Sequence, residues 1–363
     1  MGTRARVVVV PGGTNTLQVE DVTLPDPGPT QVVVKQFASG ICHSQLHELH
    51  NPQPAPRMLG HESTGVVLQA GADVSHVAEG DIVLVTWVPR NTAAAAGRPS
   101  VPRVATSAGE VRVGIGTWAD HTICDGRYVV KVDPDTPRDV TAIIGCAVIT
   151  GAGAVVTSAD VQAGQSVAIF GVGGVGLSAV AGAAAVGADP IIVVDLDDAK
   201  LEFARRFGAT HTINASQEDA VAAVHALTPR PGEFGLFGDP VSGVDFAFDC
   251  IGVRQTMEQI VPAVRVGNHG VTRGGTAVLV GVPMTDMMLS PDARLLGGEK
   301  RFIGSLGGSG VPERDFPRFL AWHREGKLDL DSLVTARYAL DEINEATQAL
   351  EAGQISGRAI LEF

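Results

Sequence analysis

Hydrophobic positions in the first 150 residues occur in short runs that Gly and Pro interrupt. The runs have the length and the β-branched content of strands, and they read ARVVVV, QVVVKQF, STGVVLQA, DIVLVTW and YVVKVD. This pattern predicts a β-rich, partly irregular domain over this part of the chain.

From about Val161 the pattern changes to an alternation of strand and helix. The strand SVAIF is followed by the helical stretch GGVGLSAVAGAAAVGA, then by the strand IIVVD and the helical DDAKLEFARRFGA. Such alternation is typical of βαβ units and predicts a parallel sheet. Later strands are expected at 244–252, 275–281 and 301–305. The last 50 residues predict two helices, in FPRFLAWHREGKL and DEINEATQALEAG, and a final strand, RAILEF.

Two segments rich in Gly and Pro, 228–243 and 265–275, break the βαβ pattern. We expect both to be loops on the surface of that domain. The sequence does not indicate their role.

Composition and charge narrow the class of protein. A chain of 363 residues is long enough for two domains, and its formal net charge of -13 repels phosphate backbones, so nucleic acid is not an expected partner. Four cysteines at 42, 124, 146 and 250 form no close-spaced disulfide framework, which favours a reducing, cytoplasmic setting. The four valines before Pro11 are too few for a signal-peptide core, and no apolar run of about 20 residues predicts a membrane span.

A glycine motif at the start of the βαβ region indicates a dinucleotide site. Gly171, Gly173 and Gly176 form G-x-G-x-x-G between the strand SVAIF and the following helix. The first Gly allows a tight turn, the second allows close approach of a pyrophosphate, and the third allows strand and helix to pack closely. Asp195 ends the next strand, where a carboxylate accepts bonds from a ribose and repels a 2′-phosphate, so NAD is favoured over NADP. The alternative is a Gly-rich turn that binds nothing.

Three residues of the first 150 are candidate metal ligands. Cys42 lies in GICHS, His61 in GHES and Cys146 in IGCAVITG. Thiolate and imidazole donors suit zinc, and a set of three leaves a fourth position open for water or substrate. Bound zinc lowers the pKa of a hydroxyl, which lets an alcohol lose its proton near neutral pH. Taken singly, each residue has an ordinary alternative as a buried structural side chain.

The motifs together resemble the zinc-containing medium-chain alcohol dehydrogenases, especially the branch with the liver and glutathione-dependent formaldehyde enzymes. They run in order over nearly the whole chain: GICHS, LGHESTGVV, GDIVLVTWVP, GTWADHTICD, GCAVITGAGAV, VAIFGVGGVGLS, VVDLDDAKLEFARRFGAT, VDFAFDCIG, VLVGVP and ISGRAILEF. The resemblance implies an α/β fold in which a doubly wound Rossmann sheet, residues 151–306, is flanked by a β-rich GroES-like catalytic domain formed by 1–150 and 307–363.

The same resemblance implies roles for individual residues. It makes Cys42, His61 and Cys146 the ligands of a catalytic zinc, Ser44 and His47 a proton relay from the bound alcohol to solvent, and Glu62 an acid behind the metal. The alternatives are that Ser44 caps a helix and that His47 is merely solvated. The implied cofactor contacts are His43, Gly171, Gly173, Gly174, Val175, Gly176, Asp195, Lys200, Val280, Val282 and Arg358. The implied substrate pocket is formed by Trp87, Met284 and Leu306, with Val282 as further apolar lining, although Trp87 could equally be an ordinary core tryptophan.

The chain also departs from the family pattern. The segment after GDIVLVTWVP carries no cysteine, where many relatives bind a structural zinc through four, so we expect one zinc per subunit. Cys124 and Cys250 are expected to be core thiols. Gln45 stands where Asp is common and is expected to orient His61 as a neutral amide. His43 replaces an arginine, and Gln53 stands near an acidic position of glutathione-using relatives.

The sequence therefore predicts a zinc-dependent alcohol dehydrogenase that transfers hydride reversibly between a primary or aromatic alcohol or its aldehyde and NAD. Two other enzymes remain open, a nicotinoprotein that retains its NAD and a dehydrogenase of a thiol–formaldehyde adduct. A non-catalytic, NAD-binding redox sensor is the alternative of another class. A homodimer or homotetramer is expected, in which the apolar strand GTAVLVG (275–281) could pair as an edge strand across a two-fold axis.

Overall fold

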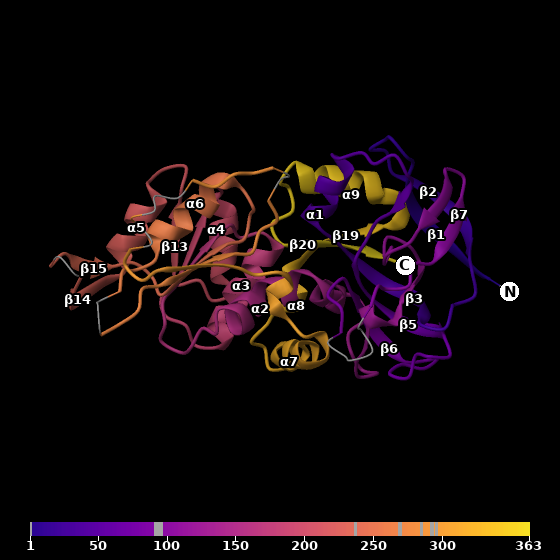
Figure 1. The fold of residues 1–363 in the computed structure, drawn as a ribbon, viewed down its shortest axis with the longest axis horizontal. Helices are drawn as coiled ribbons and strands as arrows, with labels where there is room; N and C mark the ends of the chain where they lie inside the picture. Colours follow the sequence, from indigo (N-terminus) through magenta and orange to yellow (C-terminus); the bar gives the residue numbers. More distant parts are fainter. Residues whose placement is uncertain are drawn as a thin grey trace. The chain divides into compact units, whose positions relative to one another are not determined.

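The computed structural model describes residues 2–90, 97–235, 238–267, 271–283, 286–290, 294 and 297–363. The chain folds into two compact units (Figure 1). Unit 1 comprises Met1–Ala147, Val311–Ala321 and Leu330–Phe363, and unit 2 comprises Val148–Gly310 and Trp322–Asp329. The sequence placed 322–329 in the catalytic domain. The structure groups this segment with unit 2, because Gly326 and Lys327 line one cavity with Ala184 and Phe207 of that unit.

Unit 1 is built on three described β-sheets. The largest is seven-stranded, and its central strand β3 (Gln31–Ile41) pairs with β5 (Glu62–Ala70), β9 (His121–Asp125) and β20 (Arg358–Glu362). The other members are β6 (Ile82–Thr86), β10 (Val129–Lys131) and β19 (Val334–Ala339). A second sheet joins β2 (Gln18–Leu24), β1 (Thr3–Val10) and β4 (Arg57–Met58), and a hairpin joins β7 (Arg103–Thr106) and β8 (Gly109–Arg112).

Three α-helices of the described chain lie wholly in unit 1: α1 (His43–Leu49), α8 (Leu330–Leu333) and α9 (Ile343–Glu351). A fourth, α7 (Pro312–Arg324), belongs to unit 1 as far as Ala321. Helix α9 contacts α1 and the strands β19 and β20. Ile343 and Ala346 of α9, Leu46 of α1 and the fully buried Trp118 belong to one core cluster. The N-terminal part of unit 1 therefore shares a hydrophobic core with the C-terminal helix α9, which lies some 300 positions after α1 in the sequence.

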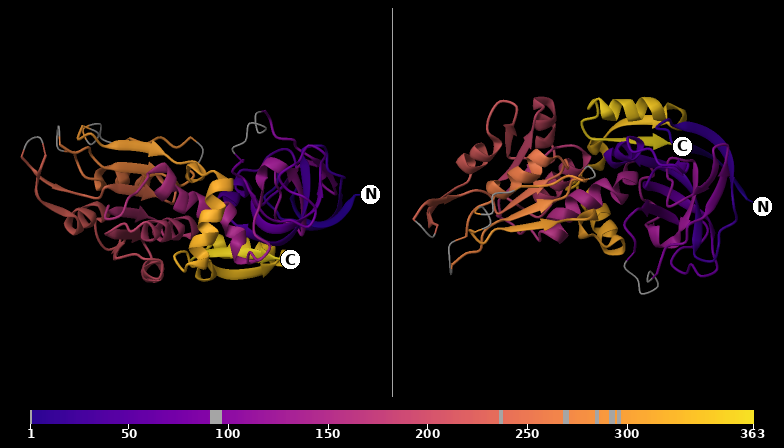
Figure 2. Two further views of the ribbon diagram at one scale, coloured as in Figure 1. Left: turned by 90° about the horizontal axis from the view of Figure 1, so that it is seen from below. Right: turned by 45° about the horizontal axis from the view of Figure 1, so that its top comes forward.

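Unit 2 contains the predicted parallel sheet. Its strand order is β13 (His211–Asn214), β12 (Ile191–Asp195), β11 (Val167–Phe170), β16 (Phe246–Asp249), β17 (Thr276–Leu279) and β18 (Arg301–Gly304). Helices lie on both sides of these strands (Figure 2). They include α3 (Gly174–Ala185) and α4 (Asp198–Arg205), and the mutually packed α5 (Ala220–Leu227) and α6 (Arg254–Ala263). The order reverses between β11 and β16, which is the switch point of a doubly wound fold.

Two local expectations are corrected by unit 2. The segment 228–243 is not a loop throughout, because Pro229–Phe234 (β14) and Pro240–Ser242 (β15) pair as an antiparallel hairpin. The strand expected at 275–281 is not at the edge of the sheet, because β17 pairs with β16 on one side and with β18 on the other. The backbone of β18 instead faces outward at that end of the described sheet.

The length and apolar content of the helices in the described residues bear on whether any of them could span a membrane. None of them is both long enough and apolar enough to cross a membrane. Helix α2 (Ala147–Gly153) begins at the last residue of the first segment of unit 1 and continues as a π-helix over Ala154–Ser158.

Candidate active site and cofactor loop

Three donor side chains of unit 1 converge although they are far apart in sequence. Cys42 lies between β3 and α1, His61 directly precedes β5, and Cys146 directly precedes α2. Their ligand atoms all lie within 4.8 Å of one another, and the two sulfur atoms are 3.9 Å apart. A tetrahedral zinc ion with Zn–S distances of about 2.3 Å requires a sulfur–sulfur separation of about 3.8 Å. The spacing of the two thiols therefore matches the edge of a zinc tetrahedron.

The third donor carries the clearest sign that a metal belongs here. The Nε2 atom of His61 is buried and has no hydrogen-bond partner. A buried polar atom without a partner is costly, so it indicates a group that the described residues do not supply. Two thiols and one such imidazole form a Cys2His set, which leaves one coordination position for a substrate.

The electrostatics of the cluster favour a charged sulfur on Cys42. The hydrogen bond with the Cys146 thiol, opposed by burial and assisted by the charge of Arg358, holds the pKa of Cys42 well below its usual value. The thiolate is the form of cysteine that binds metals. Ser44 donates a hydrogen bond from Oγ to Cys42 Sγ over 3.2 Å, so its hydroxyl lies beside the cluster. The ring of His47, one turn further along α1, meets the His43 ring edge-on with centroids 6.4 Å apart.

Gln45 does not have the role expected from the sequence. Its Oε1 accepts a hydrogen bond from the backbone N–H of Cys42 over 3.1 Å, which caps the start of α1. Its Nε2 is buried and has no partner, and the structure records no hydrogen bond from this amide to His61. The side chain at this position therefore fixes the backbone of one zinc ligand instead of orienting the imidazole of another.

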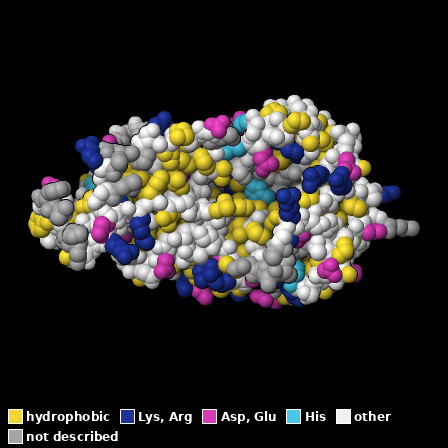
Figure 3. Space-filling view, viewed as in Figure 1, with side chains coloured by type: hydrophobic (Ala, Val, Ile, Leu, Met, Phe, Trp, Pro, Cys, Tyr) yellow, Lys and Arg dark blue, Asp and Glu magenta, His cyan; other side chains and the backbone are white. Residues whose placement is uncertain are grey.

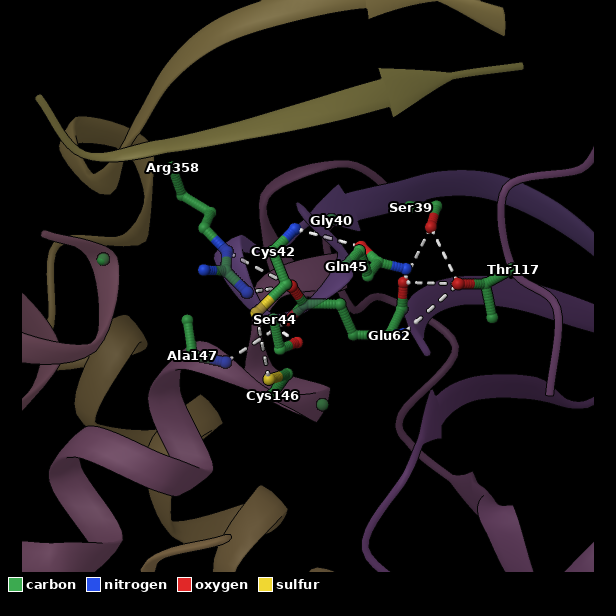
Figure 4. A network of polar contacts seen from close by, with 12 residues as sticks. Ser39, Gly40, Cys42, Ser44, Gln45, Glu62, Thr117, Cys146, Ala147 and Arg358 are labelled. Carbon is green, nitrogen blue, oxygen red and sulfur yellow. Dashed lines mark hydrogen bonds and ion pairs between the residues drawn. The ribbon is translucent and has the colours of Figure 1, made fainter. Parts of the chain in front are cut away.

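Glu62 and Arg358 form a buried ion pair next to the thiols (Figure 4). Glu62 is fully buried and Arg358 is 6% exposed. Glu62 Oε1 accepts from Nε and Nη2 of the guanidinium at 3.2 and 2.5 Å, while Oε2 accepts from the backbone N–H of Ala147 at 3.3 Å. Burial raises the pKa of Glu62 against the opposing charge of Arg358. Gly40 is required beside this carboxylate, since a Cβ there would lie 2.2 Å from Oε1.

The glycine motif of unit 2 has the geometry that each of its positions requires. Gly171 has a φ of +89°, and a Cβ on it would lie 2.2 Å from Cγ1 of Ile251. A Cβ on Gly176 would lie 1.8 Å from the carbonyl oxygen of Gly171, whereas a Cβ on Gly173, the N-cap of α3, would meet nothing within 4 Å. The first and third glycines thus serve the fold, and the second leaves open space at a helix N-terminus, as a bound pyrophosphate requires.

Asp195 ends β12 beside this loop. Its Oδ2 accepts from the backbone N–H of Val172 at 2.9 Å and its Oδ1 accepts from the N–H of Leu196 at 2.7 Å. The carboxylate therefore holds the glycine loop in place, and it remains partly exposed at the carboxyl edge of the sheet. Lys200 lies in α4, one helical turn beyond the cap Asp197, and is also partly exposed.

Large apolar side chains are exposed on unit 2. Hydrophobic groups gather on its visible face in Figure 3. Leu196, Ile251 and Val282, which follow the ends of β12, β16 and β17, are 68%, 43% and 55% exposed, and Leu306 is 79% exposed. Val280 is buried. Apolar side chains exposed along the carboxyl edge of a parallel sheet are typical of a ligand-binding surface.

The remaining predicted residues have simpler surroundings. Gly174 and Val175 form the first turn of α3, and Trp87 follows β6 with its side chain partly exposed. Met284 lies outside the described residues. Cys124 is fully buried in β9, where burial raises its pKa to about 12, and burial also raises the pKa of Cys250. Cys124 thus has the surroundings expected of a core cysteine, whereas Cys250 is only partly buried.

Sequence reasoning missed two polar residues near these sites. Thr150 in α2 has a buried hydroxyl without a hydrogen-bond partner, and Asp249 is a fully buried acid at the end of β16. A lone threonine in an apolar helix gives no signal in one sequence. Asp249 stands at a strand end next to a glycine-containing turn, which was a signal that could have been used.

Comparison with known proteins gives matches over the whole chain. Residues 28–134 match the model described as alcohol dehydrogenase GroES-like domain, and residues 174–325 match the model described as zinc-binding dehydrogenase. The chain is 32% identical to the alcohol dehydrogenase class-3 of Cereibacter sphaeroides, with 100% of both chains covered. It is also 32% identical to the NDMA-dependent alcohol dehydrogenase of Amycolatopsis methanolica, covering 98% of this chain and 97% of that one.

Solved structures show the same relationship. The benzyl alcohol dehydrogenase of Acinetobacter calcoaceticus matches with a TM-score of 0.85 and 29% identity, over 99% of each chain. Sequence and structure thus agree over both units, and the zinc cluster lies in the unit that contains the GroES-like match.

Proposed function

We propose that this chain, which belongs to the class III-like branch of the zinc-containing medium-chain alcohol dehydrogenases, oxidises primary or aromatic alcohols reversibly to aldehydes. It is an NAD-dependent zinc oxidoreductase whose substrates are small alcohols or aldehydes. The observation that carries the proposal is the orphaned Nε2 of His61, which completes a Cys2His set beside the hydroxyl of Ser44.

The residues of unit 1 divide the chemistry between them. Cys42, His61 and Cys146 would hold one zinc ion, which acts as a Lewis acid that lowers the pKa of a bound hydroxyl. We assign to Ser44 the role of accepting the proton of the alcohol, and its hydrogen bond to Cys42 Sγ supports this assignment. His47 lies three residues further along the same helix, so it lies on the same side of α1 and passes this proton to solvent. The ion pair of Glu62 and Arg358 holds the backbone next to Cys146, because Glu62 also accepts a hydrogen bond from the N–H of Ala147.

Unit 2 supplies the hydride acceptor. NAD would lie with its pyrophosphate at Gly173, Gly174 and Val175, where the N-terminus of α3 offers free N–H groups. The negative charge of Asp195 disfavours a 2′-phosphate, which supports NAD over NADP. The further cofactor contacts are proposed from the family resemblance alone, and they are His43, Lys200, Val280, Val282 and Arg358.

Two observations support a preference for an apolar alcohol. Trp87 and Leu306 are large, apolar and not fully buried, and one solved relative is by name a benzyl alcohol dehydrogenase. Gln53 is exposed and neutral, and its Nε2 donates to the carbonyl of Asn51, so it lacks the charge that would favour a glutathione adduct. We also propose that the enzyme is a cytoplasmic homodimer or homotetramer that pairs through β18, one of the two outer strands of the described parallel sheet.

The test combines a zinc count with NADH formation over a panel of alcohols and thiol–formaldehyde adducts. Wild-type protein should hold about one zinc per subunit, as a Cys2His site requires. Cys42→Ser should lose both the zinc and the activity. Cys124→Ala, which changes an equally buried thiol in β9, is the matched control and should keep both. Full alcohol oxidation by Cys42→Ser without zinc would refute the proposal.

A second candidate is a nicotinoprotein, which keeps its NAD bound and passes electrons to an external acceptor. It is favoured by one observation, the relative that is named for its dependence on NDMA. Dialysis separates the two candidates. NAD that remains bound in stoichiometric amount after extensive dialysis supports the nicotinoprotein, and NAD that is lost supports an exchangeable coenzyme. Zinc-loaded protein that oxidises no alcohol would instead support a non-catalytic NAD-binding sensor.

A further inference from the structure

Asp249 is a buried acid at the switch point of the parallel sheet of unit 2. It is the last residue of β16, the strand that faces β11 across the point where the strand order reverses. Dinucleotides bind at this point, over the carboxyl ends of the strands. The side chain of Asp249 is nevertheless fully buried, so it lies beneath the surface on which a cofactor would rest. A buried carboxylate must be matched by donors, and its partners therefore show its role.

Among the described residues, the donors to this side chain come from the turn after β16, from the helix that follows and from the backbone of Gly281 after β17. Oδ1 accepts from the hydroxyl of Thr256 at 2.6 Å and from the backbone N–H of Ile251 at 3.3 Å. The N–H of Gly252 lies 3.3 Å from Oδ1 and 3.1 Å from Oδ2. The main-chain oxygen of Asp249 accepts from the N–H groups of Val280 and Gly281, both at 2.9 Å. One residue thus joins the ends of β16 and β17 and the first turn of α6.

The turn after β16 also contacts the glycine motif on one side and the turn after β17 on the other. Ile251 packs so closely on Gly171 that a Cβ there would lie 2.2 Å from its Cγ1. Gly252 has a φ of +94°, and a Cβ on it would lie 2.3 Å from the carbonyl oxygen of Val282. Ile251 and Val282 are themselves 43% and 55% exposed. The Ile251 side chain therefore joins the glycine loop to the turn after β16, and close backbone contacts join that turn to the turn after β17.

We infer that Asp249 is a positioning residue for NAD, because it holds the turns that carry Ile251 and Val282 in register with the glycine loop. This inference rests on the proposed use of NAD. Because the carboxylate is buried, its effect on the coenzyme is exerted through these two turns. Loss of its charge should therefore weaken the binding of NAD and of NADH to a similar extent, and it should leave the zinc content of the site in unit 1 unchanged.

The same strand offers a matched control. Asp245 precedes β16 at its other end and is also buried, and it is bonded to Arg265, Arg230 and Ser166. Asp245 and Asp249 are thus two buried acids four residues apart, and only Asp249 lies at the carboxyl edge. A general loss of stability should follow from either substitution, whereas a specific loss of coenzyme affinity should follow only from a change at Asp249.

The experiment measures the dissociation constant of NADH by fluorescence titration and of NAD by competition, together with the melting temperature and zinc content of each variant. The variants are Asp249→Asn, Asp245→Asn, Thr256→Val and Thr256→Ser. For Asp249→Asn we expect a roughly 10-fold weaker NADH affinity, which equals about 1.4 kcal/mol, because an amide cannot accept all three donors. Thr256→Val should show a smaller loss in the same direction, and Thr256→Ser, which keeps the hydroxyl, should bind NADH like the wild type.

The outcomes separate this inference from the proposed function. Wild-type protein that binds no NADH would refute the proposed function itself. Normal NADH binding by the wild type together with unchanged affinity in Asp249→Asn would overturn the inference alone, as would an equal loss in Asp245→Asn. If Asp249→Asn does not fold, the Thr256 pair decides, since equal NADH affinity in Thr256→Val and Thr256→Ser would also overturn it.

Discussion

Replacing Glu62 by Gln removes one charge of the buried pair with Arg358 while keeping the shape of the side chain. The guanidinium of Arg358 loses its anionic partner, and it is only 6% exposed, so water cannot replace that partner. The new amide would also point an NH2 group at the donors of Arg358 or Ala147. The close approach of Gly40 leaves little room for a different rotamer. The substitution should therefore destabilise unit 1.

The expected size follows from this burial. Removing one partner of a buried ion pair costs about 3–5 kcal/mol, because the other group keeps its charge and loses the partner to which it is hydrogen-bonded. In a domain of roughly 150–250 residues each kcal/mol shifts the melting temperature by about 2–4 °C, so we expect a decrease of roughly 6–20 °C. Replacing both residues together, as Glu62→Gln with Arg358→Met, should cost less than the sum of the single changes, because the guanidinium charge is then absent as well.

Differential scanning calorimetry of zinc-loaded protein tests this with four species: wild type, Glu62→Gln, Arg358→Met and the double variant. Zinc is counted in each, so that a loss of metal is not mistaken for a loss of the ion pair. The reasoning would be wrong if Glu62→Gln melted within about 2 °C of the wild type, which corresponds to at most 1 kcal/mol. It would also be wrong if the two single effects simply added in the double variant.

The remaining predictions concern unit 2. Gly173→Ala should fold like the wild type but bind NAD about 10-fold less tightly, which is about 1.4 kcal/mol, because its Cβ would occupy only the open space at the helix N-terminus. Gly176→Ala should instead lose about 1–3 kcal/mol of stability through overpacking. Calorimetry measures the stability of the two variants and NADH titration measures their coenzyme affinity. The prediction is wrong if the two variants agree in both quantities. Burial lowers the pKa of Lys300 from 10.5 to about 8. The unfolded chain then binds more protons between these values, so stability should rise from pH 8 to pH 10.5. Lys300→Met should remove this part of the rise in urea midpoints, and an unchanged pH profile would contradict it.

The parts of the fold that the sequence predicted are those set by local pattern. The strand at Val167–Phe170 follows from the alternation of strand and helix along the chain, and the glycine turn and the acid at Asp195 follow from the G-x-G-x-x-G spacing and its distance from the next strand end. The three zinc ligands were found because donor type and family resemblance pointed to the same residues, and the structure brings them together. The preference for NAD over NADP through Asp195 and the proton-relay roles of Ser44 and His47 stay predictions.

The parts that the sequence did not predict depend on partners far away in the chain. Gln45 was expected to orient His61, but its partner is determined by where α1 begins, at Cys42. The segment 228–243 is predicted as a loop because of its Pro and Gly content, but β14 and β15 pair there as a short hairpin. An ion pair between Arg230 and Asp245 connects this hairpin to the residues that precede β16. Whether β17 is an edge strand depended on the pairing of Arg301–Gly304 beside it, which local hydrophobicity does not encode.

The position of Arg358 in β20 has a consequence for the order in which the protein matures. Its strand pairs with β3, and its guanidinium completes the buried pair with Glu62, 296 residues earlier in the chain. At a synthesis rate of about 5–20 residues per second, the segment with Cys42 and His61 waits roughly 15–60 s for this partner. The parallel sheet of unit 2 has all its strands by Gly304, before that point. On the ribosome all strands of the coenzyme-binding sheet can therefore be present while the zinc-binding unit still lacks an inner strand, and the metal site matures last.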